Sequence, residues 1–357
     1  PITEGIRQEV LAEVGQLNSQ GLRVLGVGYK SGLREDYAYA VDDESDMILT
    51  GYLAFLDPPK PSASPAIQAL LEHGVRTKIL TGDNEKVTQA ICEKVGLDVE
   101  HMLLGADIDQ MTDQELAEVV EKVTVFAKLS PDQKARIILQ LKRNGHAVGY
   151  MGDGINDAPS MKVADVGISV DTAVDIAKET ADVILLDKDL MVLETGIVEG
   201  RKVYANMTKY IKMTVSSNFG NIFSLLVASI FLPFLPMAPV HLIVLNLVYD
   251  LSCVALPFDN ADQDFLKQPH TWEAKSITRF MVWMGPISSV FDILTFIFLY
   301  FIIVPLVTGH HYVHGAESAL QFIILFQTGW FIESMWSQTM VIHMLRTAKV
   351  PFVQSRP

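Results

Sequence analysis

The sequence is poor in cysteine and in basic residues, and both shortages exclude classes of function. Its 357 residues include two cysteines, Cys92 and Cys253, which are too few for a disulfide framework or a cysteine-based metal cluster. The chain has 28 Lys and Arg against 42 Asp and Glu, which gives a formal net charge of −14. A nucleic-acid-binding protein needs a basic face to neutralise phosphates. The composition therefore excludes nucleic acid as a partner, and the scarcity of cysteine suits a cytosolic location for any soluble part.

The sequence also lacks a secretory leader, an internal repeat and a low-complexity tract. It opens with PITEGIRQEVLAEVGQL, which has the pattern of an amphipathic helix and not of a signal peptide. Because the first residue is Pro1 and not Met, we expect the true start of the protein to lie upstream.

Hydrophobic residues are plentiful but unevenly placed. They make up 49% of the sequence, and the mean hydropathy is +0.26. Residues 1–205 carry charges throughout, whereas long apolar stretches dominate from about Tyr210 onward. A membrane-spanning helix needs about 20 predominantly apolar residues. We therefore predict a soluble front part and, within residues 206–345, an all-α bundle of four transmembrane helices at about 213–232, 239–257, 280–306 and 320–344.

Basic residues flank these predicted spans on one side of the membrane only. They are Arg201, Lys202, Lys209, Lys212, Lys267, Lys275, Arg279, Arg346, Lys349 and Arg356. The loops 233–238 and 307–319, on the other side, contain no Lys or Arg. By the positive-inside rule, this asymmetry predicts a multi-pass protein of the cell membrane with its soluble part in the cytoplasm.

Within the soluble part, short apolar runs alternate with helical patterns. A helix is predicted at 6–17 and strands at 21–29 and 47–55, and the prolines of Asp57-Pro58-Pro59-Lys60-Pro61 then force an extended strap that suits a domain boundary. Further strands are predicted at 76–80, 123–127, 147–151, 166–170 and 183–186. Further helices are predicted at 64–72, 85–95, 113–122, 131–144, 156–163 and 174–179. This alternation is typical of an α/β domain with a Rossmann-like, doubly wound parallel sheet.

Two motifs in this domain suit the binding of a phosphoryl group. Leu80-Thr81-Gly82-Asp83-Asn84 follows a predicted strand and opens a helix, where backbone amides and the Thr81 hydroxyl can hold phosphoryl oxygens. Lys134, in LSPDQK, lies in the first turns of a later helix, where it could neutralise phosphoryl charge. Taken singly, the first motif is also a common turn and Lys134 a common surface lysine.

A third motif, Met151-Gly152-Asp153-Gly154-Ile155-Asn156-Asp157-Ala158-Pro159, again joins a strand to a helix. Its two carboxylates, Asp153 and Asp157, are four residues apart. Mg²⁺ prefers oxygen ligands and is usually held by one or two carboxylates together with phosphate. The pattern therefore predicts a Mg²⁺ site, with an Asp/Asn-rich helix cap as the alternative.

In this order, TGDN, the lysine of SPDQK and GDGINDAP resemble the motifs of P-type ATPases, a branch of the haloacid dehalogenase fold. Asp57-Pro58-Pro59-Lys60 is similar to the hinge of that family, and Gly21-Leu22-Arg23-Val24-Leu25 to the end of its nucleotide-binding domain. The resemblance implies ATP and Mg²⁺ as cofactors. It implies roles near ATP or the phosphoryl group for Arg23, Thr81, Gly82, Asp83 and Lys134, and roles at the catalytic Mg²⁺ for Asp153, Asp157 and the supporting Asn156.

The family's phosphorylated aspartate, in an Asp-Lys-Thr-Gly-Thr motif, has no counterpart in this sequence. We therefore expect an internal fragment whose partner is the remainder of the same pump polypeptide. The expected parts are the end of a nucleotide-binding domain (1–50), a phosphorylation domain without its nucleophile strand (51–205), the spans (206–345) and the start of a further membrane region (346–357). The resemblance places the nucleophile strand at the centre of the sheet, so this piece alone is expected to fold poorly and to form no phosphoenzyme.

Polar residues inside the predicted spans suggest an ion path, because ionisable groups are costly in a membrane and are usually functional. Asn218 and Asn221 share a face of the first span, and Asn246 and Asp250 share a face of the second. We assign the ion site to Asn221, Asn246 and Asp250, although amides also serve as helix-packing groups and Asp250 could have a structural role. Glu333, in the fourth span, is interpreted as a packing group or a secondary contact and is left out of the site.

These spans resemble those of magnesium-transporting P-type ATPases in YDLSCVALPFDN (249–260), in residues 277–288 and in HMLRT (343–347). Calcium and sodium pumps share Asn-Leu-x-x-Asp but carry a glutamate where Asn221 stands. One carboxylate with amides suits a single cation that keeps part of its water, as Mg²⁺ does. The resemblance implies ATP-driven Mg²⁺ import through an aspartyl phosphate. The alternatives are a calcium or proton pump, a non-catalytic truncated membrane protein or, least compatible with four spans, a soluble phosphatase.

Overall fold

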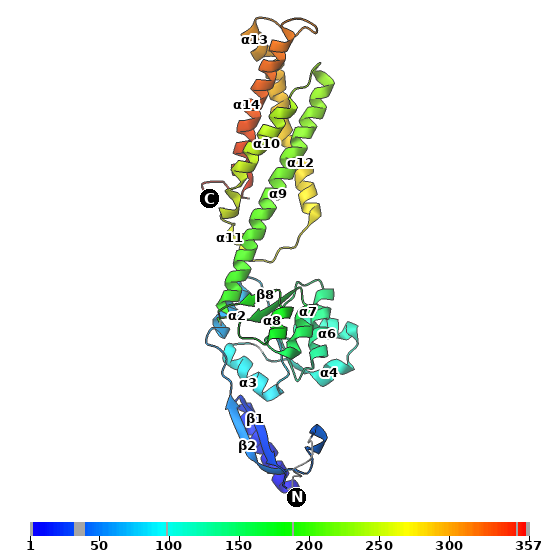
Figure 1. Cartoon of the computed structure of the whole chain (residues 1–357), viewed down its shortest axis with the longest axis vertical. Helices are drawn as coiled ribbons and strands as arrows, with labels where there is room; N and C mark the ends of the chain where they lie inside the picture. The colour runs from blue at the N-terminus through cyan, green and yellow to red at the C-terminus, as the bar shows by residue number, and fades with distance from the viewer. Residues whose placement is uncertain (1–2, 32–39, 98, 188, 348, 355–357) are drawn as a thin grey trace. The chain divides into compact units, whose positions relative to one another are not determined.

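The computed structural model describes residues 3–31, 40–97, 99–187, 189–347 and 349–354, and these form two compact units. The first unit covers Pro1–Thr195 and the second Gly196–Pro357. Figure 1 shows the elements of both units, most of the helices with their labels. Each unit is described by itself.

The first unit begins with a helix and an antiparallel pair of strands. Helix α1 (Glu4–Ser19) is followed by β1 (Leu22–Tyr29), a short 3₁₀ turn η1 (Val41–Asp43) and β2 (Ile48–Leu56). Strands β1 and β2 pair in antiparallel register from Leu22 opposite Leu56 to Tyr29 opposite Ile48. The helix and both strands were predicted from the sequence, and their positions are confirmed.

The remainder of the first unit alternates strands and helices. The strands are β3 (Ile79–Leu80), β4 (Met102–Leu104), β5 (Val125–Ala127), β6 (Gly149–Met151), β7 (Val166–Val170) and β8 (Val183–Leu185). The helices are α2 (Ala63–Glu72), α3 (Glu85–Val95), α4 (Gly105–Gln110), α5 (Asp113–Lys122), α6 (Pro131–Arg143), 3₁₀ turn η2 (Ile155–Asp157), α7 (Ala158–Val163) and α8 (Asp175–Thr180).

All strand pairs in this region are parallel, as predicted, but among the described residues they form two sheets and not one. The first sheet has the order β3-β5-β4 and the second β6-β7-β8. The prediction of a single continuous sheet is therefore wrong for the described residues. Strands β3 and β6 each lie at the edge of a separate sheet. The sequence patterns predicted neither β4 nor α4, whose segment mixes apolar and acidic residues without a clear period.

Local sequence determines where the helices of this unit begin. The side chain of Asn84 caps α3 by accepting a hydrogen bond from the Val87 amide at 3.0 Å. Thr112 and Glu115 form a capping box at the start of α5, and Ser130 and Gln133 form another at the start of α6. These caps satisfy amides that have no partner inside the helix.

Burial of apolar side chains holds α4, α5 and α6 against β5. Ile108, Leu116, Val120, Phe126 and Ile137 are all 0% exposed and form one cluster. Because each apolar side chain contributes about 1.5–3 kcal/mol when fully buried, this cluster is a major source of stability for the first unit. Leu80, which precedes the Thr81-Gly82-Asp83 loop, packs against it.

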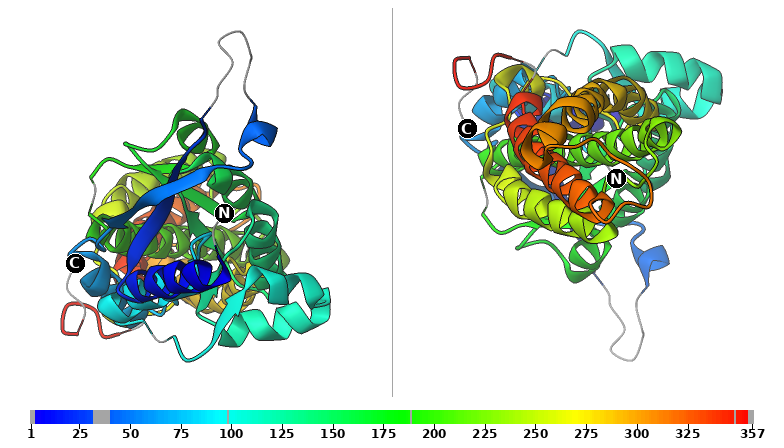
Figure 2. Two further views of the ribbon diagram at one scale, coloured as in Figure 1. Left: turned by 90° about the horizontal axis from the view of Figure 1, so that it is seen from below. Right: turned by 90° about the horizontal axis from the view of Figure 1, so that it is seen from above.

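The second unit is helical. Its elements are most of α9 (Met191–Phe231), α10 (Pro239–Cys253), η3 (Leu256–Phe258), α11 (Gln263–Leu266), α12 (Ala274–Phe298), π-helical segment η4 (Leu299–Ile303), α13 (Val304–Thr308) and α14 (Ala319–Leu345). The right-hand view of Figure 2 looks along α9, α10, α12 and α14, which lie side by side.

Small residues allow α9 and α12 to approach closely. Ser216, Gly220, Ser224 and Ala228 recur every four residues along α9, and all are buried. Ser289 of α12 donates a hydrogen bond to the Gly220 carbonyl at 2.9 Å. Interfaces of this kind are typical of helices that associate within membranes.

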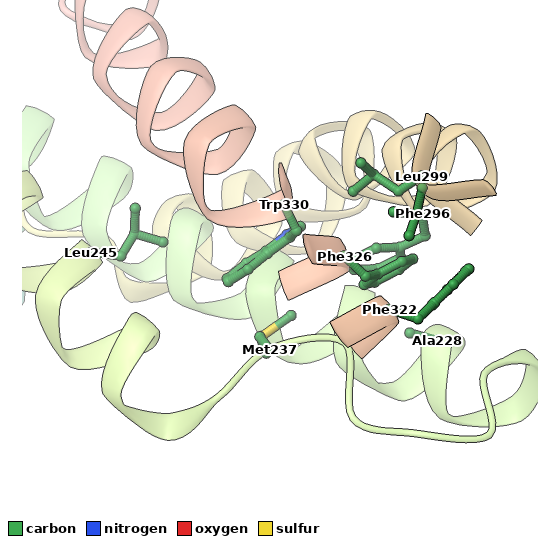
Figure 3. Packing of buried hydrophobic residues seen from close by; sticks show 9 residues of the cluster. Ala228, Met237, Leu245, Phe296, Leu299, Phe322, Phe326 and Trp330 are labelled. Carbon is green, nitrogen blue, oxygen red and sulfur yellow. The ribbon is translucent and has the colours of Figure 1, made fainter. Parts of the chain in front are cut away.

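Large apolar side chains fill the other end of the bundle. Figure 3 shows Trp330, Phe326 and Phe322 of α14 packed with Phe296 and Leu299. The tilted and edge-to-face ring arrangements in this cluster are those that aromatic pairs favour.

Three helical segments of the described chain are long and apolar enough to cross a membrane, judged by length and composition. They are Met191–Phe231, Pro239–Phe258 and Ala274–Thr308, and they contain the first three predicted spans. The fourth predicted span coincides with α14, which is long enough but carries Gln321, Gln327 and Glu333. Its crossing of the membrane stays a prediction.

The close contact between α9 and α12 predicts that Gly220→Val destabilises the second unit. A Cβ atom at Gly220 would lie 3.0 Å from the Gly285 carbonyl oxygen and 2.5 Å from Ser288 Oγ. We expect a loss of about 1–3 kcal/mol, the usual effect of overpacking. Thermal unfolding in detergent measures it. Gly200→Ala is the control, because a Cβ there meets nothing within 4 Å; equal melting temperatures for the two variants would contradict the prediction.

Candidate functional site

The loop Thr81-Gly82-Asp83 joins β3 to α3 and is held against the segment that follows β5. The Thr81 amide donates to the Phe126 carbonyl, the Leu129 amide to the Thr81 carbonyl and the Lys128 amide to the Asp83 carbonyl, at 2.8–3.0 Å. Lys128 adopts φ +52° to make this approach, a conformation unusual for a residue with a side chain. The amide of Asp83 also donates to the Thr81 hydroxyl oxygen at 3.1 Å.

Lys134 and Asp157 meet in an ion pair that connects α6 with the segment after β6. Their Nζ and Oδ1 atoms are 2.9 Å apart, and the side chains are 12% and 16% exposed. Tyr150 donates its hydroxyl hydrogen to the same Oδ1 at 2.7 Å, and the Gly154 amide donates to Oδ2 at 3.2 Å. The structure therefore brings together two of the predicted catalytic residues from separate sheets.

The environment of Asp157 keeps it ionised. Burial alone would raise the pKa of its carboxyl group, but hydrogen bonds from Lys134 and Tyr150 outweigh burial and lower the pKa below its ordinary value. Burial, together with the hydrogen bond to Asp157, raises the pKa of the Tyr150 hydroxyl far above its usual range. Tyr150 therefore remains a neutral donor.

The two carboxylates predicted to bind Mg²⁺ have different surroundings. Asp153 is exposed, and within the described residues its carboxylate has no hydrogen-bond or ion-pair partner, although its carbonyl accepts from the Val174 amide at 3.1 Å. Both oxygens of Asp157 already accept hydrogen bonds. Asp157 therefore holds Lys134 in place, whereas the Asp153 side chain is open to solvent.

Two further predicted residues lie at the edge of this site. Asn156 is exposed in η2 and makes no side-chain hydrogen bond in the described part of the chain. Arg23 of β1 lies 3.6 Å from Asp83, with side chains 67% and 38% exposed. An ion pair so exposed contributes little to stability.

Gly152 is required by the shape of this loop. A Cβ atom there would lie 2.4 Å from the Cβ of Asp157, a separation that real structures do not allow. The glycine thus permits Asp157 to fold back under the loop toward Lys134.

The predicted ion-binding residues are not assembled into one site within the described residues. Asn221 is partly buried and accepts a hydrogen bond from Gln338 of α14 at 3.0 Å. Asn246 and Asp250 are exposed on α10, beside the buried Leu245 and Tyr249, and make no hydrogen bond or ion pair in the described chain. No group of three or more His, Cys, Asp and Glu in the described chain could hold a metal ion.

A buried carboxylate that the sequence reading missed lies between α9, α12 and α14. Asp292 is 7% exposed and accepts hydrogen bonds from Ser224 at 2.7 Å and from Trp330 Nε1 at 3.0 Å. The neighbouring Glu333, which was left out of the predicted site, interacts electrostatically with Asp292, and its Oε2 is buried without a hydrogen-bond partner in the described chain. Asp292 is the only carboxylate of residues 280–306, a signal that could have identified it.

Comparison with protein families and curated proteins decides the family. Residues 6–165 match the model of haloacid dehalogenase-like hydrolases, and residues 234–357 match that of the C-terminus of cation transporting ATPases. The chain is 51% identical over 355 residues to the "Magnesium-transporting ATPase, P-type 1" of Escherichia coli K12, covering 99% of this chain. The chain belongs to the P-type cation-transporting ATPases. The predicted fold class, a haloacid-dehalogenase-like domain followed by membrane helices, is thereby confirmed.

Other relatives agree with this membership. The Salmonella typhimurium LT2 protein of the same name is 51% identical over 357 residues, 99% of this chain. The "Calcium-transporting ATPase" of Bacillus subtilis is 34% identical over 303 residues, covering 82% of this chain and 34% of the Bacillus protein. This P-type ATPase chain spans 38% of the length of the E. coli and Salmonella relatives. It is a membrane protein.

The Lys134–Asp157 ion pair predicts a pH-dependent loss of stability in Lys134→Met. At about pH 7 we expect a loss of about 2 kcal/mol, the scale of a hydrogen bond to a charged group. Because the pKa of Asp157 is lowered by folding, its contribution is present above about pH 4 and is lost as the pH falls through the folded-state pKa. The difference between variant and parent should therefore shrink toward about pH 3.

Chemical unfolding of the two proteins at both pH values measures this difference. Lys162→Met is the control, because Lys162 is exposed on α7 and has no ion pair in the described chain. A loss of stability that is the same at both pH values would contradict the assignment.

Proposed function

We propose that this chain is part of an ATP-driven Mg²⁺ transporter and that its first unit supplies half of the phosphoryl-transfer site. The observation that carries the proposal is 51% identity, over 99% of the chain, to proteins named magnesium-transporting ATPases. The geometry around Thr81, Lys134 and Asp157 supports it, because these groups follow the carboxyl ends of parallel strands, where ligands bind in open α/β sheets.

The nucleophilic aspartate is proposed to come from a strand elsewhere in the same polypeptide. Strands β3 and β6 each have one edge that no described strand pairs with. Unpaired edges expose amides and carbonyls that favour the addition of a strand. A strand between β3 and β6 would place its carboxyl end next to Thr81 and the Lys134–Asp157 pair, and would join the two sheets into one.

Each residue of the half-site has a separate proposed role. The Thr81 hydroxyl and the amides of Gly82 and Asp83 hold phosphoryl oxygens, and Lys134 offsets their charge. Asp153 holds the catalytic Mg²⁺, which when bound neutralises phosphate charge, while Asp157 and Asn156 position the surrounding groups. Arg23, on the exposed face of β1, contacts ATP.

The cation path is proposed to pass Asn221, Asn246 and Asp250. An exposed carboxylate on a spanning helix is costly unless a polar partner covers it, so the face of α10 that carries Asp250 is expected to meet further polar groups of the same polypeptide. A single carboxylate with amides suits a cation that stays partly hydrated, as Mg²⁺ does.

Helix α9 is proposed to connect the phosphoryl site with the cation path during the transport cycle. This helix continues without a break from Met191 to Phe231 and carries Asn221. Changes in the phosphoryl state of the first unit would move α9 and alter access to the cation. The Lys and Arg residues that flank the spans favour a multi-pass protein of the cell membrane with its first unit in the cytoplasm. The proposed direction of Mg²⁺ transport is import.

Two alternatives to a magnesium pump can be distinguished from it, one by transport measurements and the other by the upstream coding sequence. The first is a calcium or proton pump; the 34% identity to the B. subtilis calcium-transporting ATPase is the observation behind calcium. A non-catalytic truncated protein would lack an in-frame Asp-Lys-Thr-Gly-Thr motif upstream of Pro1, so reading the coding sequence separates it from a pump.

We predict ATP-driven Mg²⁺ movement by a chimaera in which this chain replaces the matching part of the E. coli relative. Reconstituted in liposomes with the first unit outside, it should release Mg²⁺ from the lumen when ATP is added outside. Asp250→Asn should slow this release about tenfold or more, as loss of a group that supports a metal site does. Asp175→Asn, whose carboxylate is 94% exposed on α8, is the control.

Parallel measurements with Ca²⁺ and with a proton-sensitive dye complete the test. Movement of Ca²⁺ or protons in place of Mg²⁺ would keep the pump and overturn the magnesium assignment. Mg²⁺ release that is unchanged in Asp250→Asn would overturn the proposed ion site.

A further inference from the structure

The ammonium group of Lys134 makes one hydrogen bond within the described residues. Its Nζ donates to Asp157 Oδ1 at 2.9 Å, and the Lys134 side chain is only 12% exposed. A lysine ammonium carries three N–H groups, so two of them remain for the oxygens of a ligand. Because the lysine side chain is flexible, the position of Asp157 Oδ1 decides where these two groups point.

The Asp157 carboxylate needs an anchor to hold that position. Asp157 lies in the 3₁₀ turn η2, and the terminal torsion of an aspartate side chain is soft, with a broad range of accessible angles. The Gly154 amide donates to Oδ2 at 3.2 Å. Gly154 belongs to the same loop, however, so this bond does not tie the carboxylate to the rest of the first unit.

Tyr150 provides the anchor from the sheet. It lies on β6, where it pairs with Gly167 of β7, and its hydroxyl donates to Asp157 Oδ1 at 2.7 Å, the same oxygen that Lys134 contacts. Its partly buried side chain packs against an apolar cluster of Met161, Ala173 and Ala177. The ring is thus held by apolar packing, and the hydroxyl holds one carboxylate oxygen.

The other carboxylate of this loop provides the contrast. Asp153 is exposed, and within the described residues its carboxylate accepts no hydrogen bond. A place in this loop therefore does not by itself order a carboxylate. Asp157 is ordered by donors that lie outside the loop, on β6 and α6.

We propose that Tyr150 is a positioning residue of the phosphoryl site, which fixes Asp157 and thereby directs the Lys134 ammonium at the transferred phosphoryl group. The inference rests on the proposed function, in which Lys134 offsets phosphoryl charge. Tyr150 acts through Asp157 and contacts no part of ATP. Without its hydroxyl the carboxylate rotates, and Lys134 no longer meets the phosphoryl oxygens in one fixed geometry. Loss of a fixed geometry lowers the rate of the chemical step and leaves ATP affinity unchanged.

The test measures ATP-dependent phosphate release by the chimaera carrying Tyr150→Phe, which removes the hydroxyl and keeps the ring in its cluster. The rate at saturating ATP, per folded molecule, should fall about tenfold, the scale on which loss of a supporting group acts. The ATP concentration that gives half the maximal rate should stay within about twofold of the parent value, because ATP binding itself is not changed. An unchanged rate, or a loss confined to ATP affinity, would overturn the inference.

Tyr52→Phe is the matched control. The Tyr52 hydroxyl on β2 also interacts with a carboxylate, that of Glu13, but it lies outside the phosphoryl site. This variant should keep the full rate. A purely structural role for Tyr150 would lower the melting temperature of Tyr150→Phe without changing its rate per folded molecule, and that result would contradict the proposal.

Melting temperatures test the shared oxygen without any measurement of activity. Tyr150→Phe and Lys134→Met each leave Asp157 Oδ1 with one donor, whereas the double variant leaves it with none. A partly buried charged oxygen without a donor costs more than the loss of one of two donors. At about pH 7 the fall in melting temperature of the double variant should therefore exceed the sum of the two single falls. Additive falls would show that the two side chains do not act on one carboxylate oxygen.

The outcome for the unsubstituted chimaera separates this inference from the function on which it rests. An unsubstituted chimaera that releases no phosphate from ATP would contradict the proposed function and the inference together. Phosphate release by the parent and by Tyr150→Phe at the same rate would contradict the inference alone.

Discussion

The ion pair between Lys134 and Asp157 is the contact on which the proposed phosphoryl site depends. It joins a helix that follows the β3-β5-β4 sheet to the loop that follows β6 of the other sheet. Because Tyr150 donates to the same carboxylate oxygen as Lys134 and the Gly154 amide donates to the other, the Asp157 carboxylate is held in one orientation against Lys134. The Asp153 carboxylate is exposed and has no hydrogen-bond partner in the described chain. One ion pair thus gives the two carboxylates of this motif different surroundings.

A second constraint acts in the helical unit, where polar groups within a membrane need partners. Asp292 and Asn221 satisfy it inside the unit, through Ser224, Trp330 and Gln338. Asp250 does not, because it lies exposed on α10. This difference supports a structural role for the Asp292 contacts and a role for Asp250 in a site that other parts of the polypeptide complete. The close packing of small residues between α9 and α12 gives these groups a fixed frame.

Much of this arrangement could be predicted from the sequence, for identifiable reasons. Helices α3 and α5 begin and end where predicted, because Asn84 and Thr112 are strong caps and the apolar period is regular. The Gly-Asp motifs could be predicted because each lies between a strand and a helix, where backbone amides and short polar side chains can meet a phosphoryl group. The division into two sheets could not be predicted, since pairing partners are set by tertiary contacts and not by local pattern. Asp292 was not predicted because its burial between Ser224 and Trp330 depends on how α9, α12 and α14 pack. The surroundings of Asp153 and Asp157 differ through contacts that spacing does not reveal.

The most direct test of the central claim, that this chain completes a phosphoryl site whose nucleophile lies elsewhere in the polypeptide, is a labelling experiment with two separate pieces. This chain is mixed with the upstream part of the E. coli relative in the presence of γ-labelled ATP, and the acid-stable, hydroxylamine-sensitive label on each piece is measured. The account predicts label on the upstream piece, only when this chain is present and not when it carries Lys134→Met. Label on this chain by itself, or equal labelling of the upstream piece in its absence, would contradict the account.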